Sequence, residues 1–181
     1  MSEPSVGNEV VHCHLVRDKA EMLEHLDVRW DVFVVEQEVP PVMEIDGRDY
    51  VPETLHLVAT VTDANGDESV IGAARLVADG TIPPHDSENE DDAVTIQFHV
   101  GRVAVREEWR GKKIGQQLMR AAERVAIEDA KDKNATELSL ILDAQVSAEG
   151  FYTRLGYVAT DTPTFYDAGI VHQEMSKSVS L

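Results

Sequence analysis

The chain has 181 residues, with 34 Asp and Glu against 16 Lys and Arg, and therefore a net charge of −18. This length suffices for one domain with a full-sized core. No apolar run reaches the roughly eighteen residues of a membrane span, and the N-terminus lacks the pattern of a signal peptide, so we expect a cytoplasmic protein. The single cysteine, Cys13, excludes a disulfide framework and a cysteine-rich metal site.

The acidic excess is spread along the whole chain and is not confined to one tail. Such a surface repels itself in dilute buffer, but in about 1 M salt the screening length falls to about 3 Å and the repulsion mostly disappears. The composition therefore resembles that of proteins from salt-accumulating halophiles, with an ordinary acidic cytoplasmic protein as the alternative. Either origin disfavours non-specific nucleic-acid binding, which depends on basic surface.

The first third of the chain predicts a strand followed by a helix. Residues 10–16 have strand character, and Asp18 is placed as the N-cap of a helix with Glu21 as its capping-box partner. Apolar residues then recur at helical spacing up to about Glu36. Two prolines at 40 and 41 stop the helix.

A polar loop over residues 43–53 leads to a predicted hairpin. Its strands are residues 55–62 and 70–78, and the Asn65-Gly66 pair between them is a hairpin turn signal.

The loop that follows, residues 79–92, contains the acidic run Asp86 to Asp92. We interpret this run as solvated surface, because it lacks the ligand spacing of an EF-hand calcium site.

The second half predicts alternating strands and helices. A strand ends at Val105 after starting near residue 93, and a basic turn with two glycines precedes a helix that runs to about Asp132. Further elements are a strand at 136–142, a short helix at 147–155 ended by Gly156, and strands at 157–160 and 169–176. The order predicts an α+β, or mixed α/β, fold around one largely antiparallel twisted sheet of about seven strands. We expect residues 1–9 to be flexible and residues 10–181 to form a single domain.

The basic turn, Arg110 to Gly115, predicts an anion site. It opens a helix, whose first backbone N–H groups have no intrahelical partner, and its glycines allow close approach. Three basic side chains in six residues add positive charge to an otherwise acidic protein. An ordinary exposed helix start is the alternative for this turn considered alone.

Two motifs together resemble those of the GNAT superfamily of acyl-CoA-dependent N-acetyltransferases. The first is Val103-Ala104-Val105, then four residues, then Arg110-Gly111-x-x-x-Gly115. The second is Gln145-x-x-Ala148-x-x-Phe151-Tyr152-x-x-x-Gly156-Tyr157. One helix and one strand separate them, as the cofactor-binding half of that family requires. The motifs lie within residues 95–160.

The N-terminal half is similar to a narrower group, the ElaA-like acyltransferases. The resemblance is carried by Arg29-x-x-Val32-Phe33-Val34-Val35-Glu36-Gln37, Pro40, Asp46-Gly47-x-Asp49, His56, Gly101-Arg102-Val103, Gly115-Gln116-Gln117-Leu118-Met119, Ala144-Gln145 and Gly169-Ile170-Val171-His172. It extends the match to residues 29–175. Lys113 stands where the superfamily usually has glycine, and Gln145 where many members have asparagine.

The resemblance implies acetyl-CoA as co-substrate and no metal. The pyrophosphate would lie at the glycine turn, and the pantetheine arm would pair with the strand before it, beside a bulge near Arg106 or Glu107. The residues implied in cofactor binding are Val103, Ala104, Val105, Arg110, Gly111, Lys112, Lys113, Ile114, Gly115, Gln116, Gln145 and Tyr152.

The implied reaction is direct attack of a neutral amine on the thioester. Tyr152 holds the family position of the acid that protonates the departing thiolate, although a packed aromatic beside Phe151 is the alternative. The backbone N–H of Val105 would stabilise the oxyanion. Glu36 is the candidate base, because the apolar segment before it would raise its pKa; a surface glutamate is the alternative.

Four residues are candidates for binding the acceptor: Arg29, Asp46, Asp49 and His56. The arginine, like Arg102, could hold a substrate carboxylate or pair with nearby acids. The two aspartates could recognise a cationic amine or form a turn around Gly47. The histidine could be structural or titrate near neutral pH.

We therefore expect an N-acetyltransferase for a primary amine of a small molecule. A protein or peptide N-acetyltransferase and a non-catalytic acyl-CoA sensor are the alternatives. The turn lacks the Gly-Lys-Ser/Thr ending of a P-loop and the G-x-G-x-x-G of a Rossmann site. No nucleic-acid or membrane partner is expected, and a homodimer is possible.

Overall fold

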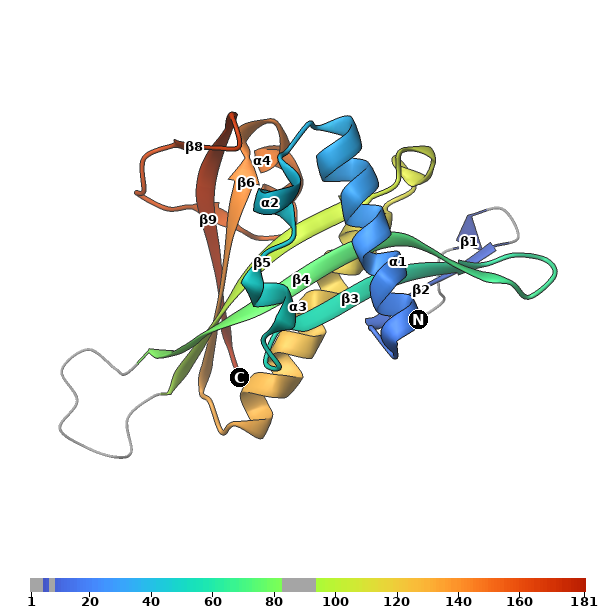
Figure 1. Cartoon of the computed structure of the whole chain (residues 1–181). Coiled ribbons are helices and arrows are strands. Elements are labelled where there is room, and N and C mark those ends of the chain that lie inside the picture. The colour runs from blue at the N-terminus through green and yellow to red at the C-terminus, as the bar shows by residue number, and fades with distance from the viewer. Residues whose placement is uncertain (1–4, 7–8, 83–93) are drawn as a thin grey trace, which may run out of the picture. The chain divides into compact units, whose positions relative to one another are not determined.

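The computed structural model describes residues 5–6, 9–82 and 94–181 (Figure 1). The acidic run at 86–92 lies outside the described residues. The chain forms two compact units, which we call the first unit (residues 1–75 and 102–122) and the second unit (residues 76–101 and 123–181). That residues 10–181 form a single domain stays a prediction.

The first unit is built on an antiparallel meander. Strands β1 (Ser5–Val6) and β2 (Glu9–Leu15) pair antiparallel, and β2 pairs with β3 (Leu55–Thr62) from Val10–Thr62 to Leu15–Leu57. Next along the sheet come β4 (Glu68–Ile82) and β5 (Thr95–Val105), whose residues are divided between the two units. The turn between β3 and β4 has Gly66 at a φ of 88°, as the Asn-Gly signal predicts.

Helix α1 (Lys19–Arg29) begins as predicted. The Asp18 side chain accepts a hydrogen bond from the N–H of Glu21 at 2.9 Å, which confirms the N-cap. The reciprocal half of the capping box is wrong, because the Glu21 carboxylate accepts from the N–H of Arg17 at 2.6 Å. Arg17 also binds Glu21 through its side chain. Arg17, the residue before the N-cap, therefore makes both the backbone and the side-chain hydrogen bonds to Glu21.

The helix continues to Glu36, as predicted, but in a wider form. Residues Trp30–Glu36 form the π-helix η1, and the N–H of Gln37 donates to the carbonyl of Val32, five residues back, at 3.2 Å. Regular apolar spacing does not distinguish a π-helix from an α-helix over two turns.

The predicted polar loop at 43–53 contains two short helices, α2 (Pro41–Glu44) and η2 (Gly47–Tyr50). Pro41 occupies the first turn of α2, where its missing N–H costs nothing. The aspartates at 46 and 49 form a capping box that holds η2.

A core cluster fixes α1 and η1 to the sheet of the first unit. It contains the buried residues Val28, Val32, Val58, Val70, Ala73 and Ala104. His25 lies in the same layer and is fully buried, with its Nε2 atom 3.2 Å from the carbonyl oxygen of Ala74. Its ring meets that of His56 edge-on, at 5.0 Å between centroids. Burial chiefly lowers the pKa of His25 to about 3.

The second unit contains the remaining strands, β6 (Glu137–Gln145), β7 (Val158–Ala159), β8 (Phe165–Asp167) and β9 (Ile170–Ser180). Strands β5 and β6 run parallel, with pairs from Thr95–Glu137 to His99–Ile141. Strand β9 pairs antiparallel with β6 along its whole length, and β7 and β8 also pair antiparallel with β9. The sheet is mostly antiparallel and has nine described strands, two more than predicted. The two additional strands, β1 and β8, are too short to show a pattern in the sequence.

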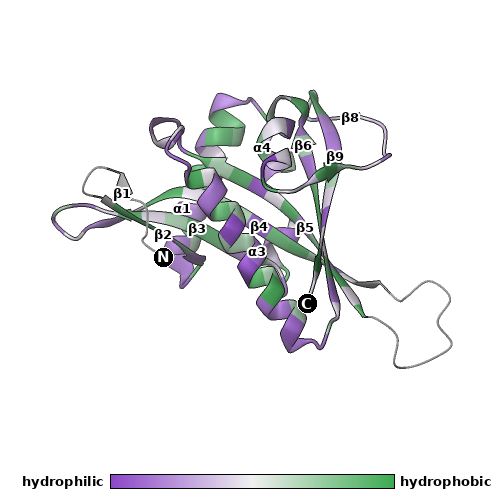
Figure 2. Cartoon of the chain, turned by 180° about the vertical axis from the view of Figure 1, so that it is seen from behind, coloured by the Kyte–Doolittle hydropathy of each residue, from purple (hydrophilic) through white to green (hydrophobic). Residues whose placement is uncertain are grey.

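Helix α3 (Ile114–Asp132) ends where predicted. Figure 2 shows polar and apolar residues alternating along it. Its buried side is rich in alanine, with Leu118, Ala121, Ala122, Ala126 and Ala130 at 0–1% exposure. The segment after β6 forms η4 (Val146–Ala148) and α4 (Glu149–Thr153), with Gly156 at a φ of 91° beyond them. No described helix is long and apolar enough to span a membrane.

Gly72 on β4 is packed tightly against β3 and β5. A Cβ atom there would lie 3.2 Å from the Ala104 carbonyl oxygen and 3.3 Å from the Ala59 Cβ. We predict that Gly72→Ala lowers the free energy of unfolding by about 1–3 kcal/mol in urea titrations at molar KCl. Gly101→Ala is the matched control in a strand, since a Cβ there meets no atom within 4 Å. Equal midpoints for both variants would contradict the tight approach.

The buried His25 predicts acid sensitivity. Below about pH 6.5 the unfolded chain binds a proton that folded His25 resists until about pH 3. The free energy of unfolding should therefore fall by about 1.4 kcal/mol per pH unit in this window from His25 alone. His25→Gln should flatten the pH dependence by that slope. Parallel pH profiles for wild type and His25→Gln would show the assignment to be wrong.

Candidate functional site

The glycine turn joins β5 to α3 through a short helix, η3 (Glu107–Trp109). Two of its residues have left-handed backbone conformations, Gly111 at a φ of 76° and Lys113 at 64°. A side chain at Gly111 would meet no atom within 4 Å, so the backbone conformation is what favours glycine there. The left-handed conformation of Lys113 is one that ordinarily favours glycine.

The turn presents the start of α3. The N–H of Gln117 donates to the Lys113 carbonyl at 3.1 Å, so the N–H groups of Ile114, Gly115 and Gln116 belong to the end of the helix that lacks intrahelical partners. The Ile114 side chain is buried and anchors the turn. With the helix dipole, this geometry suits an anion.

The basic side chains of the turn have partners of their own. Arg110 donates to both carboxylate oxygens of Glu36, at 2.7 and 2.5 Å, and its Nε donates to the Val105 carbonyl at 2.9 Å. The Lys112 ammonium lies 4.3 Å from the centre of the Trp109 ring. Arg110 thus ties the turn both to β5 and to η1.

The ion pair changes the expectation for Glu36. The carboxylate is exposed, and the hydrogen bonds from Arg110 lower its pKa. The prediction of a raised pKa is wrong, because the apolar residues before Glu36 do not cover its carboxylate. A lower pKa makes Glu36 a weaker proton acceptor.

Next to the turn, β5 has an edge that no register joins to β6 after His99 in the described residues, and we call it the free edge. The N–H of Arg106 donates to the Ile71 carbonyl of β4 at 3.0 Å. Since backbone groups alternate sides along a strand, the N–H groups of Val103 and Val105 point away from β4. An acyl-CoA arm could pair with this edge as an added strand does.

An irregularity interrupts β5, but earlier than expected. Arg102 has a φ of 55°, and residues 101–103 are all half-buried where burial otherwise alternates. The prediction of a bulge near Arg106 or Glu107 is wrong in position. Arg102 is held there by hydrogen bonds from its guanidinium to the carbonyls of Glu44 and Met43, at 3.1 and 2.8 Å.

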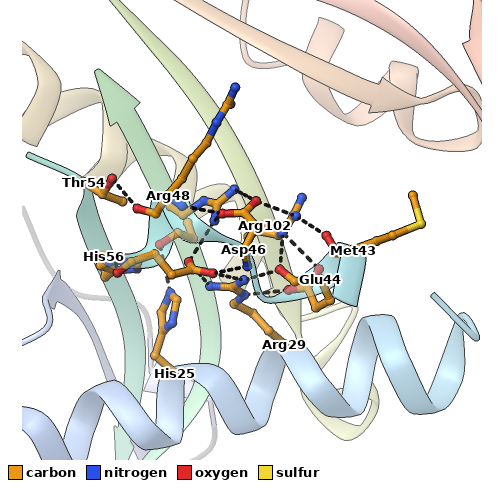
Figure 3. Close-up of polar contacts among 12 residues, drawn as sticks. His25, Arg29, Met43, Glu44, Asp46, Arg48, Thr54, His56 and Arg102 are labelled. Atoms are coloured by element: carbon orange, nitrogen blue, oxygen red, sulfur yellow. Dashed lines mark hydrogen bonds and ion pairs between the residues drawn. The ribbon is translucent and has the colours of Figure 1, made fainter. Parts of the chain in front are cut away.

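Three of the predicted acceptor residues meet in a buried cluster, shown in Figure 3. We call it the arginine network: Arg29, Glu44, Asp46, Asp49, Arg75 and Arg102. Arg29 is fully buried, and its guanidinium donates to Glu44 Oε1 and Asp49 Oδ1, both at 2.6 Å, and to the Glu44 carbonyl at 2.7 Å.

Arg75 supplies the second cation of the network. It donates to Asp46 Oδ1 and Asp49 Oδ1 at 2.9 and 2.8 Å, while Arg102 lies 3.0 Å from Glu44 Oε2. Burial alone would raise the pKa of Asp49, but hydrogen bonds from Arg29 and Arg75 outweigh it and the pKa is lowered. For Glu44, burial prevails and the pKa is raised.

The network fixes the segment from α2 to η2 against α1, β4 and β5. The guanidinium of Arg29 donates to the carboxylate of Asp49, which also accepts from the N–H of Asp46. These contacts fit the alternative that Arg29 pairs with nearby acids and the alternative that Asp49 belongs to a turn around Gly47. Asp46 keeps 31% of its side chain exposed. His56 is half-buried, with its Nε2 3.3 Å from the Asp49 carbonyl and its pKa lowered chiefly by burial.

Tyr152 lies on α4 of the second unit. Its ring packs edge-on against Phe151 and Tyr157, with centroids 4.9 and 6.1 Å away. Burial raises the pKa of Tyr152 to about 12, so the phenol stays protonated at neutral pH. Gln145 ends β6 and pairs with His172 of β9.

Two sets of residues were not predicted from the sequence. Arg75 and Glu44 complete the arginine network. The sequence feature that could have revealed Arg75 is the presence of an arginine inside an otherwise apolar strand. His99 on β5 and Asp143 on β6 form a polar pair in the second unit, with His99 Nε2 3.3 Å from Asp143 Oδ2. Over the described residues, no group of three or more His, Cys, Asp or Glu side chains is arranged to hold a metal ion.

Comparisons with known proteins agree with this architecture. The acetyltransferase (GNAT) domain family matches residues 59–179. Protein ElaA of Escherichia coli K12 is 30% identical over 154 residues, which cover 85% of each chain. The N-acetyltransferase YjcF of Bacillus subtilis is 29% identical over 164 residues, covering 90% of this chain and 96% of YjcF.

Solved structures show the same fold. An acyl-CoA N-acyltransferase from Pseudomonas aeruginosa, 29% identical, superposes with a TM-score of 0.65 over 94% of this chain and 99% of that one. The crystal structure of E. coli ElaA gives a TM-score of 0.66 at 24% identity, covering 93% and 99%. The chain therefore belongs to the GNAT acetyltransferases, is similar to ElaA, and is an acyl-CoA-dependent acyltransferase.

Proposed function

We propose that this protein transfers the acetyl group of acetyl-CoA to a primary amine of a small molecule by direct attack of the amine on the thioester. The glycine turn is the observation that carries the proposal. Its left-handed Gly111 and Lys113 lead into the free N–H groups of Ile114, Gly115 and Gln116, which suit a pyrophosphate. The similarity to the N-acetyltransferase YjcF and to the acyl-CoA N-acyltransferase of P. aeruginosa supports nitrogen as the acceptor atom.

The free edge of β5 supports the position of the pantetheine arm. In this proposal Val103, Ala104 and Val105 line the arm, and Gln145 at the end of β6 contacts it. The bound co-substrate supplies an activated acetyl thioester. The N–H of Val105 would stabilise negative charge on the thioester oxygen, because it points away from β4.

Arg110, Lys112 and Lys113 are proposed to add positive charge around the pyrophosphate. Arg110 has a second function in this scheme, because its Nε holds the Val105 carbonyl at 2.9 Å. A contact from the turn to the strand that carries the oxyanion donor would couple phosphate binding to the position of that strand.

Tyr152 is proposed as the acid that protonates the departing thiolate. A pKa raised to about 12 keeps the phenol protonated, which an acid requires. Glu36 remains the base predicted from the sequence, although its ion pair with Arg110 weakens it in that role.

The arginine network is proposed to act on the acceptor indirectly. Arg29 and Asp49 would hold the α2–η2 segment in place, and the partly exposed Asp46 and His56 would face the acceptor from it. A protein or peptide amine is the alternative acceptor, and a peptide would need an open groove beside this segment.

A screen tests the reaction. Thiol release from acetyl-CoA is followed with a library of small amines and lysine peptides in molar KCl. We predict release with a small amine, and a fall in kcat of about 100-fold in Tyr152→Phe with an unchanged Kd for acetyl-CoA. Exposed Tyr166→Phe is the control. Binding of acetyl-CoA without release by any amine, and no effect of Tyr152→Phe, would identify an acyl-CoA sensor instead.

A second variant tests the cofactor site. We predict that Gly115→Glu weakens acetyl-CoA binding at least 10-fold by calorimetry, because a carboxylate would block and repel the pyrophosphate. Gly115→Ala, which adds a methyl group without charge, should retain most of the affinity. Unchanged binding by a folded Gly115→Glu protein would place the pyrophosphate elsewhere.

A further inference from the structure

The polar pair His99–Asp143 lies where the parallel ladder of β5 and β6 ends. The last paired residues are His99 and Ile141. Beyond them, Leu142–Gln145 pair with β9, and no further register joins them to β5 in the part of the chain that the structure describes. His99 is thus the last residue of β5 that pairs with β6, and it precedes Val100 and the segment proposed to bind the pantetheine arm.

The side chain of His99 is accessible and oriented. Its strand neighbours Phe98 and Val100 are buried, whereas the His99 side chain is 27% exposed and belongs to the opposite, polar side of the strand. Nε2 lies 3.3 Å from Asp143 Oδ2, and Nδ1 lies 4.0 Å from Asp79 Oδ2. Carboxylates from both neighbouring strands therefore flank one imidazole.

One of these carboxylates, that of Asp143, holds the ring through a hydrogen bond. The hydrogen bond with His99 is the main cause of the lowered pKa of Asp143, so this carboxyl is ionised at neutral pH. From β9, His172 also interacts with Asp143, and Glu174 is its register partner. Glu174 is engaged by the Thr160 and Thr162 hydroxyls at 2.8 and 2.9 Å, which leaves Asp143 to the histidine.

We propose that His99 is the proton acceptor for the amine substrate, acting directly or through one water molecule, and that Asp143 is the residue that positions it. This inference rests on the proposed function. In that scheme the pantetheine arm pairs with Val103 and Val105, and His99 precedes Val103 by four residues on the same strand, β5. An accessible imidazole held by a carboxylate is a common general base.

The proton balance is as follows. His99 takes one proton from the bound ammonium and passes it to solvent. The neutral nitrogen then forms a bond to the thioester carbon, and the carbon–sulfur bond breaks. Tyr152 gives its proton to the sulfur and is reprotonated by the second proton of the amine. The products are the amide, the free thiol and one proton.

Two acceptors separate loss of the base from loss of the fold. A primary alkylamine such as 1,4-diaminobutane is protonated at neutral pH and needs the base, whereas hydroxylamine is already neutral. We expect His99→Gln to lower kcat with alkylamines about 100-fold, to remove the acidic limb of the pH–rate profile, and to retain most of the hydroxylamine rate. The Kd for acetyl-CoA should stay within about twofold.

Matched variants sharpen this test. Asp143→Asn should give an intermediate loss with a displaced acidic limb, and imidazole added to His99→Ala should restore part of the alkylamine rate. Gln97→Ala, two residues before His99 on β5, should behave as wild type. Glu36→Gln is measured beside them as the competing base.

The outcomes are distinguishable. If His99→Gln keeps both the alkylamine rate and the acidic limb, or if Glu36→Gln removes the limb instead, the inference is overturned and the acetyltransferase proposal stands. If the wild-type protein acetylates neither hydroxylamine nor any alkylamine, the proposed function fails and the inference with it.

Discussion

The buried guanidinium of Arg29 is the constraint on which the first unit depends. Taking a cation out of water costs several kcal/mol, and the cost is offset only if its donors are satisfied. Glu44 and Asp49 meet that requirement from a segment whose large apolar side chains are mostly exposed and therefore anchor it little. Arg75 and Arg102 then balance the carboxylates, so three cations and three anions hold α2 and η2 in one position. Removal of one member would leave another charge buried and unpaired, at a cost of about 3–5 kcal/mol.

Elements that follow local rules could be predicted from the sequence. The Asp18 cap, the alternating strand β6 and the helix α3 each result from interactions between residues close in the chain. The π-helix and the two helices within the predicted loop depend on contacts with distant residues. Arg29 and Asp49 were predicted as site residues, yet nothing local shows that Arg75, from strand β4, pairs with Asp49.

The glycine turn shows the same division. Its strand, turn and helix were predicted together because they are contiguous, and the structure adds the backbone reason, left-handed residues at 111 and 113. The properties of Glu36 could not be predicted, because the ion that lowers its pKa comes from Arg110, 74 residues away. The pair His99–Asp143 likewise needs the parallel register of β5 and β6 before the two side chains can meet.

The π-helical form of η1 has a consequence for its contacts with the segment that follows β5. Asp31 bonds to Arg106, and Glu36 bonds to Arg110. These acids are five residues apart. A π-helix, with its i→i+5 hydrogen bonds, places residues at this spacing on the same side. An α-helix places residues three or four apart on the same side, so it would turn one of the two acids away. The wider π-helical turns therefore let one helix form ion pairs with two arginines in succession. Deleting one residue between Trp30 and Glu36 would restore α-helical winding and break one of the two ion pairs.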